Sequence, residues 1–89
     1  MINKLYSVYD KQAQVYSAPF SAVNDAIAQR IVKGTLQEAG DNKLSIWPDD
    51  FALYRMAEFD DSKNIVGYEN PVHVIEVGQL QREMVAKQD

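Results

Sequence analysis

The segment from 22 to 38, AVNDAIAQRIVKGTLQE, most restricts how this chain can fold, because its apolar residues recur at helical spacing. One stripe carries apolar residues and a glycine, and the opposite side carries polar residues at successive i+4 steps: Val23, Ile27, Ile31 and Gly34 against Asp25, Gln29, Lys33 and Gln37. Ser21 is the predicted N-cap, and Asp25 in the first turn suits the positive end of the helix dipole. The pattern predicts one amphipathic helix lying on a sheet.

Two glycines bear on the course of this helix. Gly34 lowers helix propensity by about 1 kcal/mol relative to alanine. We therefore expect either a close crossing over a strand at Gly34 or a weakening of the helix there. Gly40 is the expected C-cap residue.

Strand-forming residues precede this helix. Residues 2–9, INKLYSVY, predict a strand, residues 10–12 a turn, and residues 13–17 a second short strand, so the chain opens with a hairpin. Both faces of the first strand carry large apolar groups, which favours a central or doubly covered position: Ile2, Tyr6 and Val8 on one face, Leu5 and Tyr9 on the other.

A second hairpin is predicted after the helix. Residues 40–50 collect turn formers around Leu44, Ile46 and Trp47, and we expect an ordered connection there. Residues 51–59 alternate between apolar and mixed positions, which indicates a strand. Residues 60–64 supply the turn into a further strand at residues 65–69.

The C-terminal part predicts two more elements. Asn70-Pro71 interrupts the pattern, and the β-branched residues of 72–77 predict a fifth strand. From about residue 78, Leu80 and Met84 stand at helical spacing, which predicts a short, frayed terminal helix. The whole pattern predicts an α+β fold in a single domain over residues 1–89. Its antiparallel sheet of two hairpins and a fifth strand is packed by one central amphipathic helix.

Composition excludes several classes of function. The chain has no cysteine, so disulfides, thiolate nucleophiles and cysteine zinc sites are ruled out. No secretory leader or membrane-spanning stretch is recognisable, and we expect no contact with a membrane. A net charge of −4 opposes tight non-specific binding to nucleic acid, which depends on phosphate neutralisation by Lys and Arg. Any basic surface must therefore be local.

Catalytic side chains are scarce. His73 is the single histidine, and we interpret it as structural or exposed, with a role as a ligand or base as the alternative. The acidic pairs Asp49-Asp50 and Asp60-Asp61, with Glu58 nearby, are interpreted as turn residues, and a Mg²⁺ or Ca²⁺ site is the alternative. The four glycines are too scattered for a phosphate-binding loop. We expect no enzyme, no cofactor and no metal.

Aromatic residues offer a binding alternative to core packing. The predicted strands carry five tyrosines, which either pack in the core or stack on bases of a single strand: Tyr6, Tyr9, Tyr16, Tyr54 and Tyr68. Trp47, beside Pro48, is interpreted as a lid on the core, with an interface anchor as the alternative. Three cations lie close in sequence to tyrosines, and the candidate nucleic-acid-binding residues are Lys4, Tyr6, Tyr9, Lys11 and Arg55.

Several short patterns occur in an order typical of one viral family. They comprise LYSVYD, a segment ending in Pro19-Phe20, the helix, and WPDDFALYRMAEFDD. Over residues 4–68 the chain resembles the small nonstructural protein of gokushoviruses, which are single-stranded DNA phages of the Microviridae. The matching positions are Leu5, Val8, Tyr9, Asp10, Pro19, Phe20, Pro48, Asp50, Phe51, Leu53, Tyr54, Glu58, Phe59, Asp60 and Asp61. The resemblance implies a DNA-binding or replication-assisting protein in the cytoplasm of the infected bacterium, absent from the virion and without catalytic residues.

Two hypotheses from different classes follow. In the first, the chain is a non-enzymatic phage protein that binds single-stranded DNA, or the viral replication and packaging proteins, through an exposed sheet face. In the second, it is a self-associating adaptor, a homodimer that binds a host or viral protein through its strand edges. One test is where the cations lie in the fold. Their convergence on one face would favour the first hypothesis, and their scatter would weigh against it. The cations are Lys4, Lys11, Arg30, Lys33 and Arg55.

Overall fold

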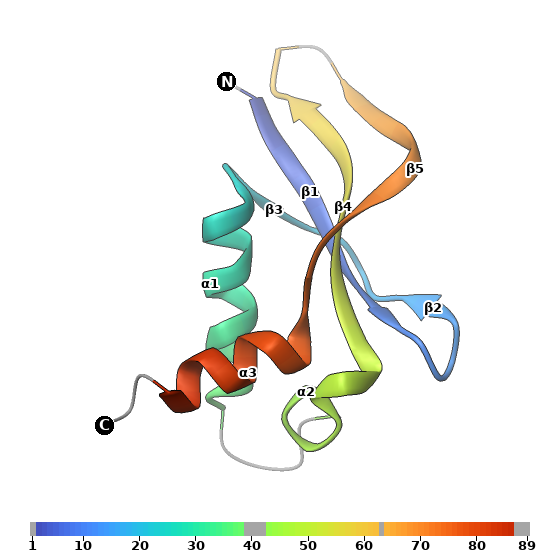
Figure 1. Cartoon of the computed structure of the whole chain (residues 1–89). Coiled ribbons are helices and arrows are strands. Elements are labelled where there is room, and N and C mark those ends of the chain that lie inside the picture. Colours follow the sequence, from blue (N-terminus) through green and yellow to red (C-terminus); the bar gives the residue numbers. More distant parts are fainter. Residues whose placement is uncertain (1, 39–42, 63, 87–89) are drawn as a thin grey trace.

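The computed structural model describes residues 2–38, 43–62 and 64–86 (Figure 1). The elements follow in the order β1 (Ile2–Asp10), β2 (Val15–Tyr16), β3 (Phe20–Ala22), α1 (Asp25–Leu36), α2 (Lys43–Ile46), the 3-10 turn η1 (Pro48–Asp50), β4 (Phe51–Asp60), β5 (Ile65–Glu76) and α3 (Val77–Ala86). This confirms the predicted α+β class with an antiparallel sheet and a C-terminal helix. Among the described residues, no helix has the length and apolar character needed to cross a membrane.

Strand β1 is the centre of the sheet, as its two apolar faces predicted. The strand order is β2-β1-β4-β5, and β3 pairs with the same edge of β1 as β2 does. The β1–β2 hairpin places Tyr9 opposite Tyr16, and β3 places Phe20 opposite Tyr6. Between β2 and β3, Ser17 bonds with β1: its carbonyl accepts the Ser7 hydroxyl at 2.7 Å. Strands β2 and β3 therefore form one broken strand alongside β1.

The start of α1 differs from the prediction. Residues 20–22, where the sequence predicts the end of a hairpin, a cap and the first helical position, form β3 instead. Asn24 has extended backbone angles, and its side-chain oxygen accepts a hydrogen bond from the Ile27 amide at 2.9 Å. Ser21 is thus not the N-cap, because pairing with β1 holds it in a strand. The C-cap is Gln37, and Gly40 lies outside the described residues.

The buried stripe of α1 is one position away from the predicted stripe. Ala28, Val32 and Leu36 are buried, whereas Ile31 is 44% exposed. Gly34 is also exposed, and a Cβ added there would have no atom within 4 Å, so no strand crosses the helix closely at this glycine. Helices α1 and α3 lie on the same side of the sheet (Figure 1). The core beneath them contains Tyr6, Ala22, Ala28, Val32, Leu36, Phe51, Leu53, Ile75, Val77 and Leu80.

Strand β5 replaces two predicted strands. Residues 65–76 form one strand, but its ladder with β4 is irregular where the sequence predicts an interruption at Asn70-Pro71. Gly67 pairs with Ala57 and Val72 pairs with Arg55, so residues 68–71 lie opposite Met56 alone. Proline has no amide hydrogen to donate to a ladder, which explains a bulge at this position. The fifth strand of the sheet is therefore β3.

The C-terminal helix is packed along part of its length. Leu80 is fully buried and Met84 packs against the core, and both lie on the helix that their spacing predicted. Residues 77–86 are helical, and the rest of the predicted tail lies outside the described residues. Trp47, interpreted as a lid on the core, is 56% exposed, so that interpretation is wrong. It stands between the short α2 and η1, which contact each other rather than bringing this side chain inward.

Candidate nucleic-acid interface

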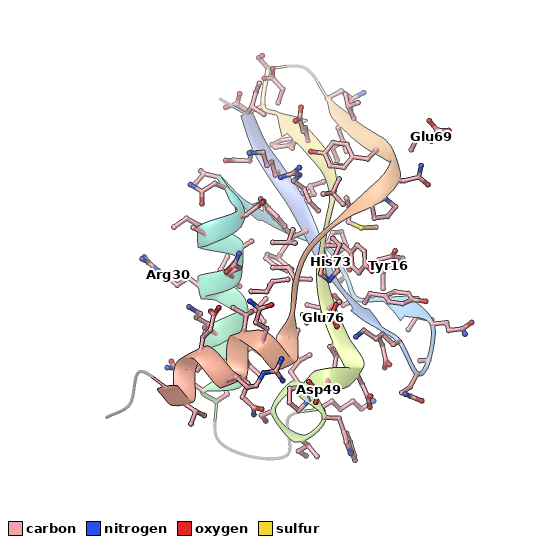
Figure 2. All side chains as sticks on the ribbon, in the orientation of Figure 1. Tyr16, Arg30, Asp49, Glu69, His73 and Glu76 are labelled. Atoms are coloured by element: carbon pink, nitrogen blue, oxygen red, sulfur yellow. The ribbon has the colours of Figure 1, made fainter. Side chains whose placement is uncertain are left out.

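Four rings gather on the face of the sheet that lies away from the helices. We call Tyr9, Tyr16, Tyr54 and His73 the aromatic platform. Ring centroids are 4.6 Å apart for Tyr9 and Tyr16, 5.9 Å for Tyr16 and Tyr54, 6.0 Å for Tyr9 and Tyr54, and 5.3 Å for Tyr54 and His73. Figure 2 shows Tyr16 on the opposite side of the sheet from α1.

The strand register explains why these rings meet. Successive side chains of a strand point to opposite faces, and residues paired across strands point to the same face. Tyr54 follows the buried Leu53 and so points to the face opposite the core. Tyr54 pairs with His73, and Tyr9 pairs with Tyr16. Each ring comes from a different strand: β1, β2, β4 and β5. The platform therefore needs all four strands in register.

The platform is open to solvent in part. Tyr16 is 42% exposed, the His73 side chain is 47% exposed, and Tyr9 and Tyr54 are half-buried. Burial, and next the neighbouring Tyr54 and Tyr9, raise the pKa of the Tyr16 hydroxyl, so this ring remains neutral near neutral pH. Exposed aromatic rings at these separations can stack on nucleobases of any sequence.

A group of charges borders the platform. Lys11 Nζ contacts Glu76 Oε1, and His73 Nε2 lies 2.5 Å from Glu76 Oε2. Lys11 Nζ also donates to the Asp49 carbonyl at 3.2 Å. Burial raises the pKa of Glu76, but the hydrogen bonds and charges of Lys11 and His73 outweigh that effect and lower the pKa below its usual value. Glu76 is therefore an anion held between the Lys11 ammonium group and the His73 ring.

Two of the predicted binding residues belong to the core side of the sheet. Tyr6 is fully buried, and its hydroxyl donates to Asp25 Oδ1 at 2.6 Å. Arg55 Nη1 lies 3.1 Å from the same oxygen, and Arg55 Cζ lies 5.8 Å from the Tyr68 ring centroid. Tyr6 and Arg55 therefore attach the start of α1 to the sheet and lie apart from the aromatic platform. Asp25, predicted on the outer side of the helix, takes part in the same contact.

The other cations are dispersed. Lys4 is half-buried and lies opposite Glu58 on β4, away from the platform. Arg30 and Lys33 belong to α1, and Figure 2 shows Arg30 on the far side of the molecule from Tyr16. Of the predicted residues, Tyr9 and Lys11 thus lie together at the platform. The five cations are therefore scattered among the described residues, which is the outcome that weighs against the nucleic-acid hypothesis.

The sequence contained a partial signal for the platform. Tyr9 and Tyr16 are symmetric about the first turn, so a hairpin register alone places them opposite each other. Asp10 closes this turn by accepting hydrogen bonds from the Gln12 and Ala13 amides at 3.0 and 3.1 Å. His73 and Glu76 were missed as site residues because the bulge in β5 decides their register with β4, and no local pattern specifies that bulge.

An apolar groove of about 470 Å³ opens on the helix side, between α1 and the β1–β2 hairpin. Ile31 and Val15 line it and are 44% and 55% exposed. The groove is lined by Val8, Asp10, Val15, Tyr16, Ser17, Phe20, Ile31, Val32, Thr35, Leu44 and Phe51. Its size falls within the range of small-molecule and peptide-anchor sites.

The acidic pairs lie at opposite ends of β4. Asp60 accepts hydrogen bonds from the Ser62 amide and hydroxyl at 3.0 and 2.7 Å, which lower its pKa. Asp49 lies 3.3 Å from Arg82 Nη1. Within residues 2–38, 43–62 and 64–86, no group of three or more His, Asp or Glu side chains is placed to hold a metal ion. The contacts of Asp60 agree with the interpretation as turn chemistry.

Comparison with known proteins places the chain in a family. The family model described as Phage ORF5 protein matches residues 3–80, which is most of the sequence. The chain belongs to the Phage ORF5 protein family. Searches of curated proteins and of solved structures each gave no match. The Phage ORF5 match spans β1 to the first turn of α3, so all four rings of the aromatic platform lie inside it.

Proposed function

We propose that this Phage ORF5 protein is non-enzymatic and assists viral DNA replication or packaging by binding single-stranded DNA on the aromatic platform. The single observation that supports the proposal is the cluster of Tyr9, Tyr16, Tyr54 and His73 on the open face of the sheet. Single-strand-binding sheets commonly stack bases on such rings. The sequence pattern around Pro48, Asp50 and Phe51 supports a gokushovirus as the source, with action in the cytoplasm of the infected bacterium.

The charge distribution specifies what kind of binding this is. The chain carries a net charge of −4, and Lys11 is already paired with Glu76. Stacking must therefore supply most of the binding free energy. With about one or two phosphate contacts, the slope of log K against log salt for a single strand would be roughly −0.7 to −1.4. A shallow salt dependence distinguishes this mode from binding through a basic groove.

Tyr54→Leu is expected to weaken binding of a fluorescein-labelled 15-nucleotide oligo-dT about 5- to 30-fold, because stacking contributes roughly 1–2 kcal/mol per base. Fluorescence anisotropy at 50 mM NaCl measures the effect. Tyr54 is the appropriate ring because it contacts the other three.

Tyr68→Leu is the matched control, since it makes the same chemical change at a tyrosine outside the platform. Its affinity should stay within about twofold of the unmodified protein, as expected for a residue without a base contact. Absence of oligo-dT binding by the unmodified protein at 20 mM NaCl would refute the proposal. Equal losses of affinity in both variants would show that the aromatic platform is not the binding surface.

A second candidate function is self-association through the apolar groove. Leu44 of α2 lines the groove, and Ile46 and Trp47, which follow it closely in the chain, are 47% and 56% exposed. Pairing along the outer edge of β5 is less favourable, because residues 68–71 bulge and Pro71 lacks a donor. We therefore propose a second copy of the chain as the occupant of the groove.

Ile31→Glu is expected to convert the dimer to a monomer without unfolding the chain, because Ile31 lines the groove and is 44% exposed. Burying a charge against apolar side chains costs several kcal/mol, enough to lower association more than 100-fold. Size-exclusion chromatography with light scattering gives the mass. Ala26→Glu adds the same charge to an exposed position of α1 outside the groove and should remain dimeric. A monomeric unmodified protein at 100 µM, a concentration at which roughly micromolar dimers persist, would exclude this candidate.

A further inference from the structure

Glu76 is held from two sides at the border of the aromatic platform. Its Oε1 atom contacts Lys11 Nζ, and its Oε2 atom lies 2.5 Å from His73 Nε2. Lys11 belongs to the β1–β2 turn, His73 to β5, and Glu76 is the last residue of β5 before α3. Figure 2 shows His73 and Glu76 near one another on this strand. One carboxylate thus bridges two donors from separate parts of the sheet.

The contacts of Glu76 with Lys11 and His73 are not explained by a contribution to folding stability. The side chains of Lys11, Glu76 and His73 are 39%, 36% and 47% exposed. Ion pairs with this much exposure contribute little to folding, because water screens the charges and ordering the side chains costs entropy. The position of the group beside the rings suggests a use in binding.

The geometry resembles that of a bound phosphodiester. The two oxygens of one anion contact a Lys ammonium group and a His ring nitrogen, and both of these groups can donate hydrogen bonds to the oxygens of a phosphate. His73 also touches Tyr54, with 5.3 Å between ring centroids. Lys11 and His73 therefore lie beside the rings on which a base would stack, within the same group of side chains.

We infer that Lys11 and His73 form a phosphodiester subsite, and that Glu76 occupies this subsite until a single-stranded nucleic acid displaces it. The inference rests on the proposed function. Glu76 competes with the ligand's phosphate for both donors, which lowers affinity. It also selects for ligands that stack, since a free phosphate brings no stacking energy to offset the displacement of the carboxylate.

Glu76→Gln is the direct test, because the amide keeps the shape of the side chain and removes its charge. Anisotropy with 15-nucleotide oligo-dT should show about 5- to 10-fold tighter binding at 50 mM NaCl. The slope of log K against log salt should steepen by about 0.7 for each phosphate contact released to the ligand. Glu69→Gln is the matched control: it removes the same charge from an exposed position of β5, which Figure 2 shows far from His73.

Combining Lys11→Ala with Glu76→Gln provides a second test. The gain in affinity should disappear in the double variant, while its circular dichroism spectrum matches that of the unmodified protein. If Glu76→Gln and Glu69→Gln change affinity and slope equally while the unmodified protein binds, the subsite is refuted and the proposed function stands. If no variant binds oligo-dT at 20 mM NaCl, the proposed function and the subsite are both refuted.

Discussion

Leu80→Ala is expected to lower the free energy of unfolding by about 2–5 kcal/mol, because it removes a buried leucine side chain and leaves a cavity. Leu80 is fully buried in the core cluster, on a helix that the sequence predicts to be short and frayed. Helix α3 contacts α1, β4 and β5, so its position also fixes the end of β5 that carries His73 and Glu76. Urea denaturation followed by circular dichroism measures the change.

Val85→Ala is the control for this prediction. Val85 lies on the same helix and is 64% exposed, so its truncation should change the free energy of unfolding by no more than about 0.5 kcal/mol. Equal effects of the two substitutions would mean that α3 is not docked through Leu80. A large effect of Leu80→Ala alone would establish α3 as part of the cooperative unit.

Tyr6→Phe is expected to change how stability depends on alkaline pH. Burial, and next the hydrogen bond to Asp25, raise the pKa of the Tyr6 hydroxyl above its usual value. In the unfolded chain this hydroxyl titrates near pH 10. Above that pH the folded state keeps a proton that the unfolded state has lost, so the free energy of unfolding falls by about 1.4 kcal/mol for each further pH unit.

The Tyr6→Phe variant lacks this proton. Near pH 7 it should be about 0.5–1.5 kcal/mol less stable, because the hydrogen bond to Asp25 is lost. Above pH 10 the free energy of unfolding of the unmodified protein should fall more steeply than that of the variant. The two slopes should differ by about 1.4 kcal/mol per pH unit, so the curves should cross near pH 11. Urea denaturation between pH 7 and 12 gives both curves. Parallel curves above pH 10 would show that Tyr6 titrates normally in the folded protein.

Local patterns were sufficient to predict β1, α1, β4 and α3, but not β3, the continuous β5 or the contacts between the elements. The spacing of apolar residues predicted the helix around Ile27. Its buried stripe nevertheless runs through Ala28 and Val32, and Ile31 lines the open groove. Ser21 and Asn24 are equally suitable caps by composition. Pairing of residues 20–22 with β1 decides between them, and that pairing is a long-range property.

The residues of the candidate site were likewise predicted only in part. Tyr9 and Lys11 were predicted to bind and lie at the platform, since a hairpin turn places them near Tyr16. Tyr6 and Tyr9 were predicted on opposite faces of the first strand, but no local pattern indicated which of those faces meets the core. Asp25 determines the orientation of Tyr6 and Arg55 by accepting hydrogen bonds from both across the core, and only the packing of α1 brings that carboxylate into place.

The distribution of the platform rings over β1, β2, β4 and β5 has a thermodynamic consequence. A partly unfolded chain that loses any one of these strands loses part of the platform as well. A ligand bound there would therefore protect the sheet as a unit, raising the melting temperature of the entire transition in proportion to the logarithm of ligand concentration. Calorimetry of such a complex would record one shifted peak, with no separate early melting of the outer strands.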